Sequence, residues 1–98
     1  MSKKLKLTQW NILDALDDEE SIAAYLQVVA NEKNPEELIA AIGTVAHARG
    51  INKMADDLGI KRETLYKNLN GQTKPRFDTI CSVIDKLGFE FSFKPKHV

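Results

Sequence analysis

The spacing of four residues between Asn52 and Gly71 constrains the fold of this chain more than any other feature of its sequence. A small residue, a glycine and two apolar residues stand at offsets of 0, 4, 5 and 10, as Ala55, Gly59, Ile60 and Leu65. Two short helices that cross steeply need a small side chain at the crossing and a residue that tolerates positive φ in the turn. The apolar pair would fill the space between the helices. We therefore expect a helix-turn-helix over about residues 52–69.

Two longer helices are predicted before this motif. The acidic residues 17–20 supply a cap and first-turn acids for a helix that ends near Asn31. Asn34 followed by Pro35 is typical of a second helix start, and Gly50 is suited to end that helix. Apolar residues at helical spacing would form the buried faces of these helices: Ile22, Tyr25, Leu26, Val29, Leu38, Ile39, Ile42, Val45 and Ala46.

The rest of the chain predicts three shorter helices and a strand. The helices are expected at about 53–58 with Asn52 as the cap, at about 62–69, and at about 77–87. Residues 89–93 then alternate with the period of a half-buried strand. We expect one domain in three parts, an extended segment (1–16), a helical region (17–88) and a strand with a tail (89–98). The predicted fold class is all-α, with five helices and a short C-terminal β-strand.

The charged residues of the motif suggest contacts with DNA. The second helix of a DNA-binding helix-turn-helix lies in the major groove, and its N-terminal residues meet base edges. Arg62 can pair with guanine, Glu63 can accept from cytosine, and Lys67 can reach guanine or a phosphate. Other polar residues around the motif are expected to contact phosphates: Asn52, Lys53, Lys61, Tyr66, Asn70, Lys74 and Arg76.

Structural roles remain open for the same residues. Glu63 is equally explained as a first-turn acid that favours the helix dipole, and Tyr66 as a packing residue against the neighbouring helix. The net charge of zero conceals eight acids and one base in residues 14–37, and seven bases and three acids in residues 49–76. Two partner surfaces of opposite sign would explain this asymmetry, and so would two solvated faces.

The motif residues also resemble known repressors. The stretch 50–69 resembles the helix-turn-helix of lambdoid Cro repressors, and 70–77 resembles the loop that follows the recognition helix in Cro/C1-type repressors. Nearly the whole chain resembles the addiction-module antidote proteins, through residues 17–26, 34–38, 46–50, 62–66, 75–79 and 86–88. Relatives usually carry Ser where Lys61 caps the recognition helix here, which implies a weaker cap.

This resemblance implies a Cro/C1-type (lambda repressor-like) fold and a function. The chain would be a sequence-specific DNA-binding antitoxin of a type II toxin–antitoxin module. It would bind operator DNA, repress its own operon and neutralise a small, basic, RelE/ParE-like toxin encoded nearby. A stand-alone phage-type repressor without a toxin is the alternative, because both proteins bind operators as dimers.

Two protein-binding surfaces follow from this expectation. An acidic segment would complement a basic toxin, and Trp10 would be its apolar anchor unless that ring closes the domain's own core. The acids concerned are Asp17, Asp18, Glu19 and Glu20. A homodimer is expected through the last helix or through the strand that carries Phe89, Phe91 and Phe93, although that strand would equally pair with residues 3–8 of its own chain.

Nothing in the sequence indicates an enzyme, a metal site or a cofactor. The histidines are His47 and His97, the single cysteine is Cys81, and no glycine-rich phosphate loop or nucleophile motif is present. A single cysteine excludes an internal disulfide and fits a cytoplasmic location. No apolar run approaches the length of a membrane span, and no membrane partner is expected.

Overall fold

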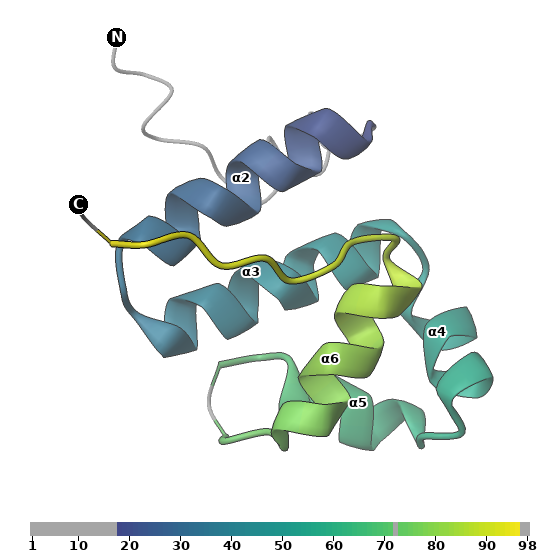
Figure 1. Cartoon of the computed structure of the whole chain (residues 1–98). Helices are drawn as coiled ribbons and strands as arrows, with labels where there is room; N and C mark the ends of the chain where they lie inside the picture. Colours follow the sequence, from purple (N-terminus) through teal and green to yellow (C-terminus); the bar gives the residue numbers. More distant parts are fainter. Residues whose placement is uncertain (1–17, 72, 97–98) are drawn as a thin grey trace, which may run out of the picture.

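The computed structural model describes residues 18–71 and 73–96, and this part of the chain contains five α-helices (Figure 1). They are α2 (Glu19–Asn31), α3 (Pro35–Ala48), α4 (Ile51–Leu58), α5 (Arg62–Asn68) and α6 (Phe77–Lys86). The long helices α2 and α3 run in opposite directions side by side, and the three shorter helices gather at one end of this pair (Figure 1). None of the helices in the described ranges is long and apolar enough to cross a membrane.

The starts of α2 and α3 are those that the sequence predicts. The carboxylate of Asp18 accepts a hydrogen bond from the backbone N–H of Ser21 at 2.7 Å, and this bond lowers the pKa of Asp18. The side-chain oxygen of Asn34 accepts from the N–H groups of Glu36 and Glu37 at 3.1 and 3.2 Å. Both caps satisfy N–H groups that the first turn of a helix leaves without partners.

The predicted start of the short helix α4 is wrong by two residues. The helix begins at Ile51, not at Lys53, and Gly50 occupies the capping position with a left-handed φ of 98°. Ile51 is buried, so its side chain anchors the first turn of α4 in the core. Asn52 therefore lies inside the helix and does not cap it. The glycine turn after α4 is confirmed, because Gly59 has a φ of 71°.

The hydrophobic core lies where the short helices meet α2 and α3. Ala55 and Leu65 are fully buried, as expected for the crossing of α4 and α5. Leu69 and Leu87 cap the C-terminal ends of α5 and α6 and are also buried. The complete cluster comprises Ile22, Ile42, Val45, Ala46, Ile51, Met54, Ala55, Leu65, Leu69, Val83, Ile84 and Leu87.

A close backbone approach joins α3 to the end of α5. Gly43 is buried in α3, and a Cβ atom built on it would overlap the carbonyl oxygen of Leu69. Only glycine leaves room for that carbonyl at this point. The position of α5 therefore depends on the absence of a side chain at residue 43, which was not predicted from the sequence.

The predicted all-α class with five helices is confirmed for the described residues, but the predicted C-terminal strand at residues 89–93 is not present. The N–H of Phe89 donates to the carbonyl of Ile84 at 3.1 Å, and the Phe89 ring packs against the core. Residues 90–96 then cross α2 and α3 as an extended segment (Figure 1) and form no backbone hydrogen bond within the described ranges. A strand requires a ladder of hydrogen bonds with a neighbour. Its expected partner in the same chain, residues 3–8, lies outside the described residues.

Candidate nucleic-acid interface

The candidate interface is built on α4, α5 and the turn between them. In this turn the N–H of Ile60 donates to the carbonyl of Ala55 at 3.0 Å, and the N–H of Gly59 donates to that of Asp56 at 3.2 Å. Leu65 is fully buried on the inner side of α5. These contacts hold α5 across the end of α4, so the polar side of α5 faces solvent.

The residues predicted to read bases all lie on this exposed side. Arg62 and Glu63 occupy the first turn of α5, and Lys67 follows in its last turn. Lys61 is the capping residue, its side chain makes no capping hydrogen bond, and it is exposed. All three predicted base-reading residues are therefore accessible on α5.

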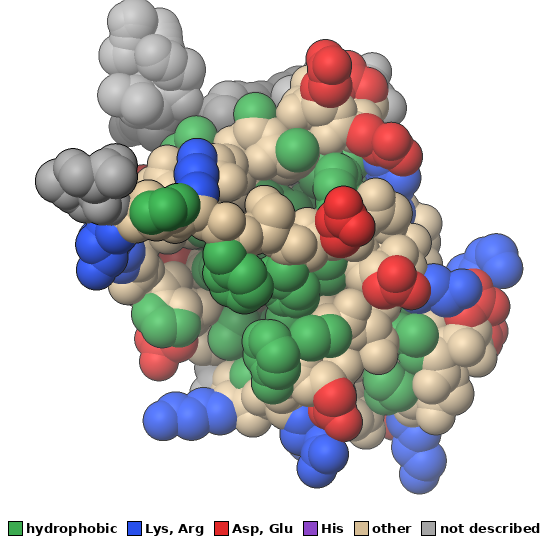
Figure 2. All heavy atoms as spheres, in the orientation of Figure 1, with side chains coloured by type: hydrophobic (Ala, Val, Ile, Leu, Met, Phe, Trp, Pro, Cys, Tyr) green, Lys and Arg blue, Asp and Glu red, His purple; other side chains and the backbone are tan. Residues whose placement is uncertain are grey.

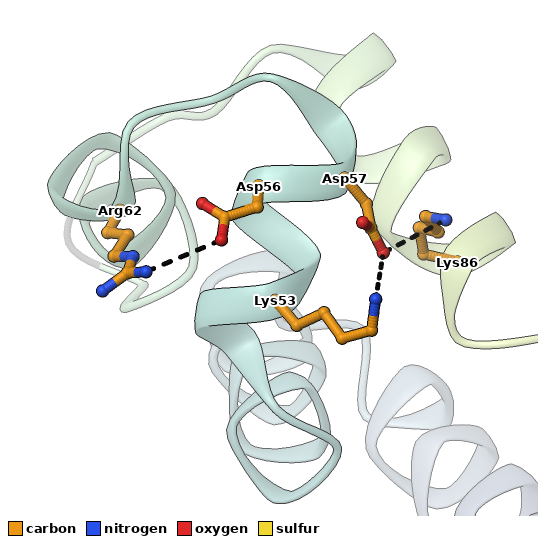
Figure 3. A network of polar contacts seen from close by, with 5 residues as sticks. All are labelled: Lys53, Asp56, Asp57, Arg62 and Lys86. Atoms are coloured by element: carbon orange, nitrogen blue, oxygen red, sulfur yellow. Dashed lines mark hydrogen bonds and ion pairs between the residues drawn. The ribbon is translucent and has the colours of Figure 1, made fainter.

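Acidic residues of α4 form ion pairs with several neighbouring cations (Figure 3). Arg62 Nη2 lies 3.6 Å from Asp56 Oδ2, and this pair joins α5 to α4 across the turn. Asp57 Oδ2 lies 3.5 Å from Lys53 Nζ and 3.5 Å from Lys86 Nζ, so it joins α4 to α6. The Arg62 and Asp56 side chains are 57% and 65% exposed. Exposed ion pairs of this kind are weak, and a competing anion can replace the carboxylate.

Tyr66 links α5 to both α4 and α3. Its hydroxyl donates to the side-chain oxygen of Asn52 at 3.2 Å, and its ring centroid lies 5.1 Å from that of His47. This is the packing role that the sequence left open for Tyr66, and its ring is still 41% exposed. The structure places Asn52 and Tyr66 side by side, and both were predicted to contact phosphates.

The loop after α5 holds the remaining predicted phosphate ligands. Thr73 Oγ1 donates to the carbonyl of Lys67 at 2.9 Å and ties the loop to α5. Arg76 donates through Nε and Nη2 to the two carboxylate oxygens of Asp78, at 3.0 Å each. This bidentate hydrogen bond raises the pKa of Arg76 and lowers the pKa of Asp78. Lys74 and Asn70 are exposed in the same loop.

Three of the predicted cationic DNA ligands have no ion pair within residues 18–71 and 73–96: Lys61, Lys67 and Lys74. Lys53, Arg62 and Arg76, in contrast, are paired with carboxylates. These acidic partners were not predicted from the sequence. The spacing of Lys53 and Asp57, four residues apart in a helix, is a signal that could have revealed one pair. The pair of Arg62 with Asp56 depends on how the turn between α4 and α5 folds, so the sequence carries no such signal for it.

The residues predicted to bind other proteins are only partly described. Asp18, Glu19 and Glu20 are exposed at the start of α2, whereas Trp10 and Asp17 lie outside the described residues. Phe91 and Phe93 are exposed, whereas the ring of Phe89 packs against the core. No group of three or more potential metal ligands occurs among the residues described.

Comparison with known proteins places this structure in a family. The family described as "Probable addiction module antidote protein" matches residues 6–95. An uncharacterized protein of Haemophilus influenzae is 37% identical over 91 residues, which cover 93% of this chain and 92% of that protein. No solved structure matches the chain at a significant level. Antidotes act on a toxin partner and are generally not enzymes. Since the match extends over nearly all of its length, the chain belongs to the addiction module antidote family.

Proposed function

We propose that this protein is a DNA-binding antitoxin that acts as a homodimer, represses its own operon and neutralises a RelE/ParE-like toxin. Family membership supports the antidote role. The observation that carries DNA binding is the exposure of Arg62, Glu63 and Lys67 on α5, with Glu63 and Lys67 on the side opposite the buried Leu65. In this proposal α4 and α5 are a Cro/C1-type helix-turn-helix, and α5 enters the major groove.

The cations around α5 divide into two groups in this interface. Lys61, Lys67 and Lys74 have no carboxylate partner within the described ranges and are suited to contact phosphates. Arg62 must leave Asp56 to pair with a guanine edge. Because the pair is exposed, this exchange has a low cost. Asn52, Lys53, Tyr66, Asn70 and Arg76 complete the proposed contacts with the DNA backbone.

The proposed toxin surface is the acidic start of α2. Asp18, Glu19 and Glu20 are exposed there, and a basic toxin would be attracted to them. Asp17 and Trp10 remain part of this proposal. The carboxylate of Asp18 also caps α2, so its replacement would affect both the helix and the surface charge.

Fluorescence anisotropy with the DNA upstream of the protein's own gene tests DNA binding. Arg62→Ala should weaken operator binding by about 1–3 kcal/mol and relax selectivity at one base position. Lys74→Ala should weaken binding to all sequences and reduce its salt dependence. Lys33→Asn is the matched control, because it removes one exposed positive charge far along the chain from α5, and Asn tolerates the φ of 63° at this position. Unchanged operator affinity of Arg62→Ala would show that α5 does not read the operator.

Co-purification tests the antidote role separately. A small basic protein encoded beside this gene should bind the wild-type chain, and replacement of Glu19 and Glu20 by Lys should weaken that binding without loss of operator affinity. If no neighbouring protein binds while the operator is still recognised, the stand-alone repressor is the correct function.

A further inference from the structure

Two exposed aromatic rings lie side by side where the C-terminal segment passes the start of α6, and a third exposed ring follows on that segment. Phe77 and Phe91 are 71% and 49% exposed, and their ring centroids lie 5.9 Å apart. Phe93 is 93% exposed. Figure 2 shows hydrophobic side chains gathered on this face of the molecule. A contiguous group of exposed rings is costly to leave in water and is typical of a surface that binds another protein.

The backbone of the same segment also lacks hydrogen-bond partners among residues 18–71 and 73–96. Residues 90–96 are all exposed and form no backbone hydrogen bond within the described ranges. An extended run of free N–H and C=O groups is a template for a strand from another chain. The alternation of this segment with a period of two residues predicts a strand, and the described part of the chain supplies no neighbouring strand for it.

The sequence of the segment is complementary to itself in one antiparallel register. If two copies pair about Ser92, Glu90 of each copy stands opposite Lys94 of the other. Phe91 then stands opposite Phe93, so aromatic residues face each other on one side and opposite charges on the other. Centring the pair on Phe91 or Phe93 instead breaks the match of Glu90 with Lys94.

The ends of the segment fit this register as well. Pro95 has no N–H to donate, so the ladder of hydrogen bonds can end there. At the other end Phe89 is already bound to the core of its own chain through the carbonyl of Ile84. The strand pairing would therefore extend over the short segment between Phe89, which is held by its own chain, and Pro95.

We propose that residues 89–95 form the dimer interface, as an antiparallel strand pair centred on Ser92, with Glu90 and Lys94 of opposite copies forming its two ion pairs. The inference rests on the proposed homodimer and specifies how its two copies bind each other. Such a contact is two-fold symmetric and uses the same patch on both copies. It also places the partner copy's aromatic side chains on the exposed rings of Phe77 and Phe91.

Charge exchange tests the register, with self-association measured by analytical ultracentrifugation at low salt. Glu90→Lys and Lys94→Glu each place two like-charged pairs in the interface, so each variant should dimerise about tenfold more weakly than the wild type. An equimolar mixture of the two variants should form heterodimers, because every pair across the interface is then complementary. The double exchange, Glu90→Lys with Lys94→Glu, should restore wild-type association.

Lys96→Glu is the matched control, because it reverses an exposed charge in the same segment outside the proposed pairs. The register is wrong if the single variants associate as the wild type does, or if a chain ending at Gly88 remains dimeric. A wild-type chain that stays monomeric at tens of micromolar refutes the interface. The interface is refuted in the same way if the chain is monomeric and its C-terminal segment is covered only when the toxin is added. Operator binding by the wild type is measured in parallel and separates these failures from a failure of the proposed DNA-binding function.

Discussion

Gly43→Ala distinguishes local helix preference from tertiary packing, since the two predict opposite changes in stability. Within a helix, alanine is more favourable than glycine by about 1 kcal/mol. In this structure the added Cβ would overlap the carbonyl oxygen of Leu69 and lie 3.1 Å from the Leu69 Cβ. The obstacle is backbone, so no rotation of a side chain can relieve the overlap. Overpacking of this kind costs about 1–3 kcal/mol.

The free-energy cost of overpacking in Gly43→Ala should lie near the upper end of this range of about 1–3 kcal/mol, because α5 must move to relieve the overlap. After subtraction of the gain in helix preference, we expect a net loss of about 1–2 kcal/mol in the free energy of unfolding. A loss of 1 kcal/mol lowers the Tm of a domain of this size by about 4–8 °C. Circular dichroism during thermal and urea unfolding measures both quantities.

Val28→Ala is the control for this experiment. Val28 lies in α2 and is 59% exposed, so its truncation should change stability by less than about 0.5 kcal/mol. Gly43→Ala should also weaken operator binding, since the displaced Leu69 directly follows α5. A Gly43→Ala variant as stable as the wild type, or more stable, would show that α3 and the end of α5 are not in close contact.

The remaining predictions concern a cap, a charge pair and acid sensitivity. Asn34→Ala should lower the free energy of unfolding by about 1 kcal/mol in urea titrations, because two N–H groups of α3 lose their acceptor. Asp56→Asn should strengthen operator binding several-fold, because it frees Arg62 and removes a negative charge near DNA. The control variant Glu32→Gln should bind the operator as the wild type does. An Asp56→Asn variant with wild-type operator affinity would show that Asp56 does not restrain Arg62. NMR titration should place the pKa values of Asp18 and Asp78 below the ordinary value of an aspartate, since both carboxylates accept hydrogen bonds as anions. A carboxylate whose pKa is lower in the folded state than in the unfolded state stabilises the fold at pH values above the unfolded-state pKa. This stabilisation should disappear as the pH falls through the folded-state pKa values. Asp78→Asn should reduce the dependence of the free energy of unfolding on pH.

Local signals in the sequence account for much of the fold. Asp18 and Asn34 were predictable as caps because a helix start needs an acceptor within two or three residues, and both act over that distance. The alanine and glycine of the motif were predictable because the crossing and the turn impose strict size and φ requirements. These requirements act within a few residues of the chain.

Features that depend on distant residues were not predictable. The role of Gly43 follows from the path of Leu69, which lies 26 residues further along the chain. The start of α4 at Ile51 follows from burial of that side chain in a core built by other helices. The strand prediction at 89–93 was wrong for a related reason. Alternation reports which sides of a segment are apolar, whereas a strand also needs a hydrogen-bonding neighbour that the alternation does not reveal.

The acidic residues of α4 suggest how the proposed interface would divide phosphate contacts from base reading. Lys61, Lys67 and Lys74, which have no ion pair in the described ranges, can neutralise phosphates of any sequence. Arg62 reaches a base only when it leaves Asp56, so on a wrong sequence the carboxylate remains its better partner. A guanine with two acceptors at the correct position compensates this loss, whereas other bases do not. In this proposal the ion pair keeps Arg62 away from DNA of the wrong sequence, and its exchange for a base contact slightly lowers the affinity for the operator.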